Sequence, residues 1–182
     1  MRVFSLLFSV LLFAQQPDKP ADSTTQNLVK LENVTISAIR ADINTPISFN
    51  NVEKKQIEIE NIGKDLPMVL KNLPSVVTTS DAGAGVGYTG IRIRGSDASR
   101  VNITINGFPF NDAESHGTYW VNLPDFVSSV EEIQVQRGVG TSTNGSGAFG
   151  ASININTENP SKIPFSSISS SLGSFATFKN TL

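Results

Sequence analysis

The stretch that decides the fold runs from residue 91 to residue 157 and contains IRIRG (91–95), VNITING (101–107), IQVQRG (133–138) and ASININT (151–157). Residues two apart in a strand share a face, so Ile, Val and Ala lie on one side of each segment and Arg, Asn, Thr and Gln on the other. The pattern predicts four short strands that build a sheet with one apolar face and one hydrogen-bonding face. Such a polar face needs a polar partner.

Two helical segments are predicted beside these strands. Residues 65–73 carry leucine and valine on one face, have Pro67 in the first turn and end before Pro74. A second short helix is predicted from Asn122, a good N-cap, to Val130. Helices interleaved with strands, together with a short hairpin connection between the first two strands, predict an α+β fold. We expect a small mixed four-stranded sheet with short helices.

Length and composition exclude several classes of protein. The 182 residues carry a net charge of −2 and no basic run, which does not support binding of nucleic acid. The chain has no cysteine and one histidine, so neither a disulfide framework nor a centre with several histidines can form. At this length the chain can hold one ordinary domain with a core and tails.

The N-terminal region reads as three segments. Residues 1–14 combine a basic start with an apolar run, which is typical of a secretory signal peptide and too short to span a bilayer. Residues 15–32 are polar and contain two prolines, which predicts a flexible tether. The alternating segment 33–38 then suits pairing with the sheet edge of another protein. The alternatives are a core segment at the start of a soluble protein and an edge strand of the following domain.

Three further patterns bear on nucleotide binding, metal binding and catalysis. Residues 145–150 fit G-x-G-x-x-G, but a strand follows rather than a helix, so we expect a loop with close backbone approach. Asp112, Glu114 and His116 alternate and could ligate a metal, although such groups in a loop are more often solvated or bind a ligand. No serine lies in a recognisable triad motif, so we predict no catalytic residues, no enzyme activity and no cofactor.

Five motifs in a fixed order carry a resemblance to a known family. They are LPMVLKNLPSV (66–76), IRIRG (91–95), INGFP (105–109), VEEIQVQRG (130–138) and GAFG (147–150) before the last strand. In this order they resemble the plug of TonB-dependent outer-membrane receptors. The family often has proline at position 139, a carboxylate in place of Gln134 and glycine in place of Ala151.

The resemblance implies a transport function. It predicts a plug over residues 40–157 that fills the lumen of a 22-stranded β-barrel in the outer membrane of a Gram-negative bacterium. TonB would pair with the box-like strand Val34, Thr35, Ile36, Ser37 and Ala38, while a scarce nutrient such as a ferric siderophore or cobalamin binds the outward loops. By position, these loops provide the predicted ligand-binding residues Asp81, Tyr88, Ser96, Asp97, Asp112, Glu114, His116, Tyr119 and Trp120.

Two arginines and the C-terminal residues complete the prediction. The resemblance implies that Arg94 and Arg137 form an electrostatic latch to carboxylates of the barrel wall, and Glu131 is a candidate neighbour inside the chain. Residues 163–182 resemble the first strand or two of a truncated barrel, since 22 strands need about 220 residues. The alternative function is a secreted or periplasmic binding module without a barrel.

Overall fold

The computed structural model describes residues 40–140, 144, 147–174, 176 and 178–182 of the chain. The predicted signal peptide, tether and coupling strand (residues 1–38) lie outside the described residues. Among the described residues, no helix is long and apolar enough to cross a bilayer.

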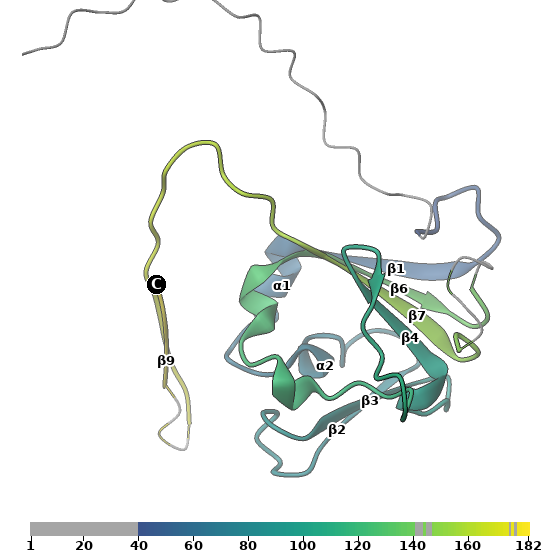
Figure 1. Ribbon diagram of the computed structural model, residues 1–182. Helices are drawn as coiled ribbons and strands as arrows, with labels where there is room; N and C mark the ends of the chain where they lie inside the picture. Colours follow the sequence, from purple (N-terminus) through teal and green to yellow (C-terminus); the bar gives the residue numbers. More distant parts are fainter. Residues whose placement is uncertain (1–39, 141–143, 145–146, 175, 177) are drawn as a thin grey trace, which may run out of the picture. The chain divides into compact units, whose positions relative to one another are not determined.

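The main sheet has five strands in the order β1 (Ser48–Glu53), β6 (Val130–Arg137), β7 (Ala151–Thr157), β4 (Val101–Ile105) and β5 (Phe108–Pro109) (Figure 1). The β4 strand runs parallel to β7, whereas the other neighbouring strands are antiparallel. The α+β class with a mixed sheet is therefore confirmed. The sheet contains five strands rather than the four expected, because β1 and the two-residue β5 join it and β3 (Thr89–Ile93) pairs elsewhere.

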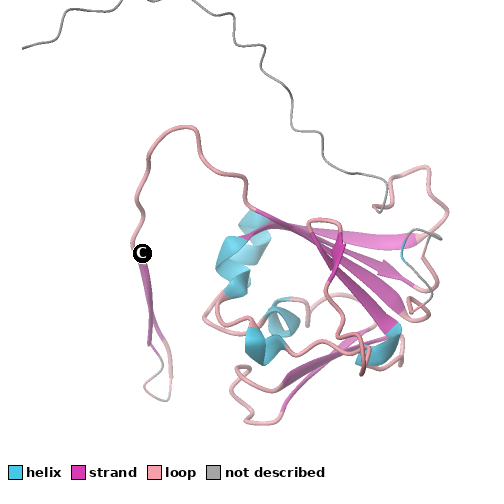
Figure 2. Cartoon of the chain, in the orientation of Figure 1, coloured by secondary structure: helices cyan, strands magenta, loops and turns pink. Residues whose placement is uncertain are grey.

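One face of this sheet is covered by α1 (Lys54–Glu60), α2 (Leu66–Val69) and the antiparallel pair of β2 (Val76–Ser80) and β3 (Thr89–Ile93), as Figures 1 and 2 show. The core forms between these elements and the apolar side of the sheet. Its fully buried side chains come from α1, the α2 segment, β3 and the sheet, and include Ile57, Leu70, Ile93, Ile133, Ile153 and Ile155, whereas β2 contributes only the partly buried Val76.

The polar face of the sheet is also buried. Gln134, Gln136, Ser152, Asn154 and Thr104 are each at most 3% exposed. The backbone of Ala41 bonds to the Gln134 side chain, and Asn144 donates to the Gln136 side chain, so segments on either side of the strands fold over this face. The polar partner expected for this face is thus supplied in part by Ala41 and Asn144. Much of the cover comes from the chain itself.

Residues 91–95 do not belong to the main sheet. The β3 strand pairs with β2, whereas β4 pairs with β7 and β5. The physical reason is burial, because Ile91 and Ile93 point into the core from opposite the sheet and are at most 2% exposed. A strand that caps a core shows the same alternation as a strand within a sheet.

Both predicted helices are shorter than expected. The α2 helix ends at Val69, and residues 70–73 form a turn instead of continuing it. The second helix is replaced by two 3₁₀ turns, η3 (Trp120–Asn122) and η4 (Phe126–Ser129), on either side of Pro124. Proline lacks the N–H that a continuous helix needs, and Asp125 adopts a left-handed φ of 54°.

The C-terminal residues form a hairpin of β8 (Ser169–Leu172) and β9 (Phe178–Thr181). Residues directly opposite in an antiparallel pair share a face, so Leu172 and Phe178 lie on one face, and Ser171 and Lys179 on the other. Ser170 and Asn180, two residues further along each strand, share the face of Leu172 and Phe178 and are joined by a hydrogen bond of 2.9 Å.

Candidate ligand-binding loops and arginine pair

The glycine-rich loop between β2 and β3 is fixed at its base. Asp65, which is 6% exposed, accepts a hydrogen bond at 2.8 Å from the Thr89 hydroxyl and donates its backbone N–H to Gly85 O at 2.9 Å. Gly85 N–H donates to the Ser80 hydroxyl at 3.0 Å. From this base the loop presents the exposed Asp81 and Tyr88, the latter 68% exposed.

Gly85 cannot carry a side chain in this loop. Its φ is +79°, and a Cβ atom would lie 3.0 Å from both Lys64 Cδ and Met68 Cγ. The positive φ itself favours glycine. The close approach of the loop to α2 therefore explains why residue 85 is glycine.

The acidic loop of residues 111–117 is built around Asp112. One carboxylate oxygen of Asp112 accepts hydrogen bonds from Glu114 N, Ser115 N and the Ser115 hydroxyl. The hydrogen bond from the Ser115 backbone, followed by that from the Ser115 hydroxyl, lowers the pKa of this carboxyl below its ordinary 3.8. Asp112 thus shapes its own loop, which leaves Glu114 and His116 exposed on it.

No group of three metal-ligating side chains that could hold an ion occurs in the described part of the chain. The predicted alternation of Asp112, Glu114 and His116 does not produce a shared face, because the loop turns rather than extends. His116 itself has a φ of 56°.

Three other predicted ligand-binding residues have structural positions. Asp97 begins the 3₁₀ turn η2 (Ala98–Arg100) and accepts from Ser99 N and its hydroxyl, and the Ser99 hydroxyl bond is the main cause of its lowered pKa. Ser96 exchanges backbone hydrogen bonds with Ile93 in a tight turn. Trp120 is 2% exposed and belongs to the core, so it faces away from any surface ligand.

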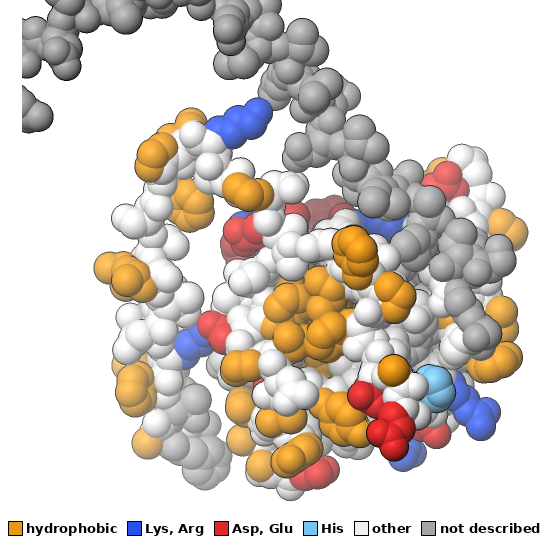
Figure 3. Space-filling model, viewed as in Figure 1, with side chains coloured by type: hydrophobic (Ala, Val, Ile, Leu, Met, Phe, Trp, Pro, Cys, Tyr) orange, Lys and Arg blue, Asp and Glu red, His pale blue; other side chains and the backbone are white. Residues whose placement is uncertain are grey.

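Five of the nine predicted ligand-binding residues have exposed side chains that form no hydrogen bond or ion pair with the described residues. They are Asp81, Tyr88, Glu114, His116 and Tyr119. Figure 3 shows acidic, basic and histidine side chains gathered at one corner of the molecular face and hydrophobic side chains at its centre. The combination of charged groups with exposed tyrosines can bind a polar molecule that has an apolar body.

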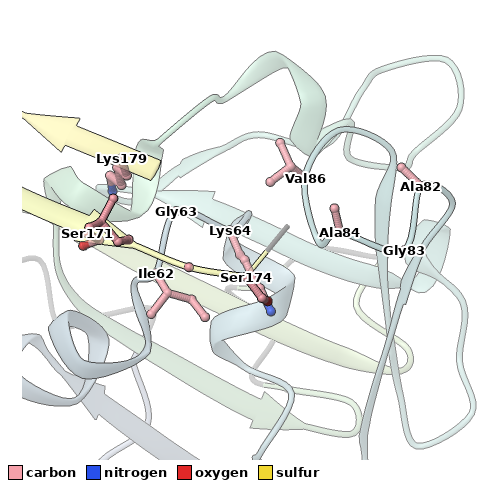
Figure 4. Close-up of a pocket in the computed structure, with 12 residues that line it drawn as sticks. Ile62, Gly63, Lys64, Ala82, Gly83, Ala84, Val86, Ser171, Ser174 and Lys179 are labelled. Carbon is pink, nitrogen blue, oxygen red and sulfur yellow. The ribbon is translucent and has the colours of Figure 1, made fainter. Parts of the chain in front are cut away.

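The loop of residues 82–86 also borders a hollow of about 690 Å³. Figure 4 shows Ala82, Ala84 and Val86 on one side and Ser171 and Lys179 of the hairpin on the other. The hollow is lined mainly by small and aliphatic residues.

Arg94 and Arg137 converge on the turn after α2. Arg94 N–H donates to Ser75 O at 2.9 Å, and Arg137 Nη1 donates to Pro74 O at 3.3 Å. Arg94 Nη1 lies 2.9 Å from the position that a Cβ of Gly138 would occupy, so its guanidinium passes directly over the residue after Arg137.

Neither arginine forms an ion pair with a described carboxylate. Arg94 is exposed, and Arg137 Nε is buried without a partner among the described residues, although Nη2 donates to the Ser48 hydroxyl at 2.8 Å. Glu131, the expected neighbour, lies 3.9 Å from Lys54 instead. A guanidinium group without a described carboxylate partner can accept a two-point pair with an acidic partner.

Two polar centres were missed by sequence analysis. Lys179 of β9, whose side chain is 16% exposed, forms an ion pair with Asp125 and donates to Asn61 Oδ1 and Ser128 Oγ at 3.2 and 3.0 Å. Gln134 is 1% exposed and joins Ala41, Asn51 and Gln136. Its place on the polar side of the alternating segment 133–138 was the signal that could have identified it.

Comparison with known proteins gives the family of this fold. Residues 41–152 match the model of the TonB-dependent Receptor Plug Domain. The vitamin B12 transporter BtuB of Vibrio vulnificus is 29% identical over 153 residues, which are 84% of this chain and 23% of that protein. The probable TonB-dependent siderophore receptor PirA of Acinetobacter baumannii is 25% identical over 169 residues, 86% of this chain and 22% of that protein.

The fold agrees with solved receptors. The crystal structure of the ferric yersiniabactin uptake receptor FyuA from Yersinia pestis superposes with a TM-score of 0.55 at 17% identity, over 74% of this chain and 20% of that one. The chain therefore spans less than a quarter of the length of these relatives, and what it spans is their plug. The chain belongs to the TonB-dependent receptor plug domain family.

Proposed function

We propose that this chain is the plug portion of an active-transport receptor in the outer membrane of a Gram-negative bacterium. The observation that carries the proposal is the plug fold matched over residues 41–152, with relatives named as a transporter of vitamin B12 and a siderophore receptor. The transported molecule is a scarce nutrient of this kind, either cobalamin or a ferric siderophore. Residues 1–14 direct export, and TonB pairs with residues 33–38.

The exposed loops are the ligand-binding surface in this proposal. Asp81 and Tyr88 stand on one loop whose base is fixed by Asp65, and Glu114, His116 and Tyr119 stand on or beside the other. Rigid bases with exposed polar and aromatic side chains limit the entropy that ligand binding costs. Asp97 and Asp112 support these loops from within rather than contacting the ligand.

The arginine pair supports the presence of a barrel around the plug. A partly buried guanidinium is stabilised by a bidentate carboxylate, and the described residues supply none to Arg94 or Arg137. Carboxylates on a barrel wall would provide these partners. The β8–β9 hairpin, which contacts the plug through Lys179, is the start of that wall in this proposal.

A growth panel tests the proposed function. The gene for the receptor that contains this plug is deleted, and growth is measured with cobalamin or with catecholate or hydroxamate ferric siderophores as the limiting nutrient. We expect loss of growth on one of these compounds, restored by the intact gene, and the protein in the outer-membrane fraction. Normal growth on every compound, with the protein in the periplasmic fraction, would support a binding module without a barrel instead.

A further inference from the structure

An ion pair attaches Arg40, the first described residue of the chain, to Glu132 of the interior strand β6. Arg40 Nη1 donates to Glu132 Oε2 at 2.8 Å, and Arg40 Nη2 donates to Glu132 Oε1 at 2.5 Å. The Arg40 side chain is 13% exposed, so water screens this bidentate pair less than an open surface pair. Planar two-point pairing of this kind also fixes the direction of the chain at Arg40.

A second attachment follows at the next residue. Ala41 N–H donates to Gln134 Oε1 at 2.8 Å, and Gln134 Nε2 donates to Ala41 O at 3.0 Å. The side-chain amide thereby binds both sides of one peptide position, as a neighbouring strand would. Gln134 Nε2 also donates to Asn51 Oδ1 at 2.8 Å, and Gln136 Nε2 donates to Gln134 Oε1 at 2.9 Å.

These four bonds use both donors and both acceptor positions of the Gln134 amide. A carboxylate, which the family often has here, could not donate to Ala41 O or to Asn51 Oδ1. It would also leave a charge at a position that is 1% exposed. The amide at residue 134 is therefore matched to the bound N-terminal segment.

Arg40 also compensates a repulsion within the sheet. Glu132 on β6 lies directly opposite Glu53 on β1. Like charges at directly opposed positions of an antiparallel pair destabilise it. The Arg40 guanidinium offsets this repulsion, so the strand pair and the N-terminal segment stabilise each other.

We propose that the Arg40–Glu132 and Ala41–Gln134 contacts form a clamp that positions the coupling strand and carries a pull on it to β6. The inference rests on the proposed function, because it assumes that residues 33–38 are the segment on which a partner pulls. One residue separates Ala38 from Arg40, so the clamp is the first described contact on the path of the force. Since β6 pairs with both β1 and β7, that force enters the interior of the sheet rather than its edge.

Single-molecule pulling on the 182-residue chain tests the clamp. The chain has no cysteine, so Ser37→Cys and Leu182→Cys provide two unique attachment points. We expect the first rupture to need less force in Arg40→Ala and in Gln134→Glu than in the parent chain. Exchange of the Ala41 amide hydrogen should be about tenfold faster in both variants. Arg40→Ala loses a charge-assisted hydrogen bond, and Gln134→Glu loses a buried one.

Two control variants separate the clamp from general stability. Lys54, which pairs with Glu158 at 2.6 Å away from the N-terminal path, is the matched ion-pair control, and Lys54→Ala should leave the first rupture unchanged. The exchange of charges in Arg40→Glu with Glu132→Arg should restore the parent force. Should Arg40→Ala not fold, Arg40→Lys removes the two-point geometry but keeps the charge, and it should also lower the force.

An unchanged first rupture in the folded Arg40 and Gln134 variants would overturn the proposal. The same holds if Lys54→Ala lowers the force as much as they do. The measurement requires neither TonB nor a transported molecule, so its failure is distinct from a negative growth panel.

Discussion

A methyl group added at Gly150 would collide with the turn that begins at Ser96. A Cβ atom there would lie 2.4 Å from Ser96 Cβ, 2.6 Å from Ser96 Oγ and 3.2 Å from Arg100 O. The backbone cannot withdraw freely, because Gly150 N–H donates to Arg100 O at 2.9 Å and Gly150 O accepts from Gly138 N–H at 2.8 Å. Such overpacking costs about 1–3 kcal/mol of the free energy of unfolding.

Gly150→Ala should therefore lower Tm by about 2–12 °C, given about 2–4 °C for each kcal/mol in a chain of this size. The assay is thermal unfolding followed by circular dichroism, with guanidinium titration to obtain the free energy. Because Ser96→Gly removes both of the nearest atoms, Gly150→Ala should cost much less in that background. Gly147→Ala is the matched control, since nothing lies within 4 Å of its Cβ position. It should change stability by less than about 0.5 kcal/mol.

Equal losses from Gly150→Ala in the parent and Ser96→Gly backgrounds would refute the steric reasoning. The cost would then come from backbone conformation rather than from contact with the turn, and the double-mutant cycle separates these two causes.

Three further predictions concern the loops and the arginine pair. Replacing His116 and Tyr119 by alanine should weaken ligand binding, measured by calorimetry, without changing Tm. If affinity is unchanged in this variant while substitutions in other loops reduce it, this loop does not bind the ligand. Because its own loop lowers the pKa of Asp112 below 3.8, the loop is stabilised above that pH and loses this stabilisation as pH falls through the lowered pKa. Protection factors of the loop amides, which correct for the intrinsic pH dependence of exchange, should therefore fall on acidification in the parent but stay flat in Asp112→Asn, and parallel curves would contradict the assignment. In the full receptor, the double variant Arg94→Ala with Arg137→Ala should have faster amide hydrogen exchange in the plug and should admit bulky antibiotics. An exchange rate equal to that of the parent would show that the two arginines do not act as a latch.

The sequence predicted those parts of the fold that local pattern controls. Alternation identified three of the sheet strands, but the expected hairpin between the first two predicted strands does not form, because β3 pairs with β2. The edge strand β1 was missed because Ser48–Glu53 has one buried side chain, Val52, and so no clear alternation. Whether β3 joins the sheet or caps the core depends on tertiary contacts, because both positions bury the same two isoleucines.

The candidate site was predictable as a set of loops but not as a set of roles. Asp112, whose carboxylate is bound by its own loop, and Asp81, which is exposed, were both predicted to bind the ligand. An aspartate two or three residues before serine can be a cap or a ligand, and only the backbone path decides. Trp120 illustrates the opposite case, since an aromatic residue beside polar ones can still turn into the core.

The proposed function requires that residues 33–38 pair with TonB. Its most direct test is uptake of the nutrient identified by the growth panel in cells that carry Ile36→Pro in the full receptor, with Ile36→Val as the control. Proline removes the N–H that strand pairing needs, whereas valine keeps it. We predict that Ile36→Pro abolishes uptake while equilibrium binding of the nutrient stays at the parent level, and that Ile36→Val transports normally. Uptake by Ile36→Pro at the parent rate would contradict the account.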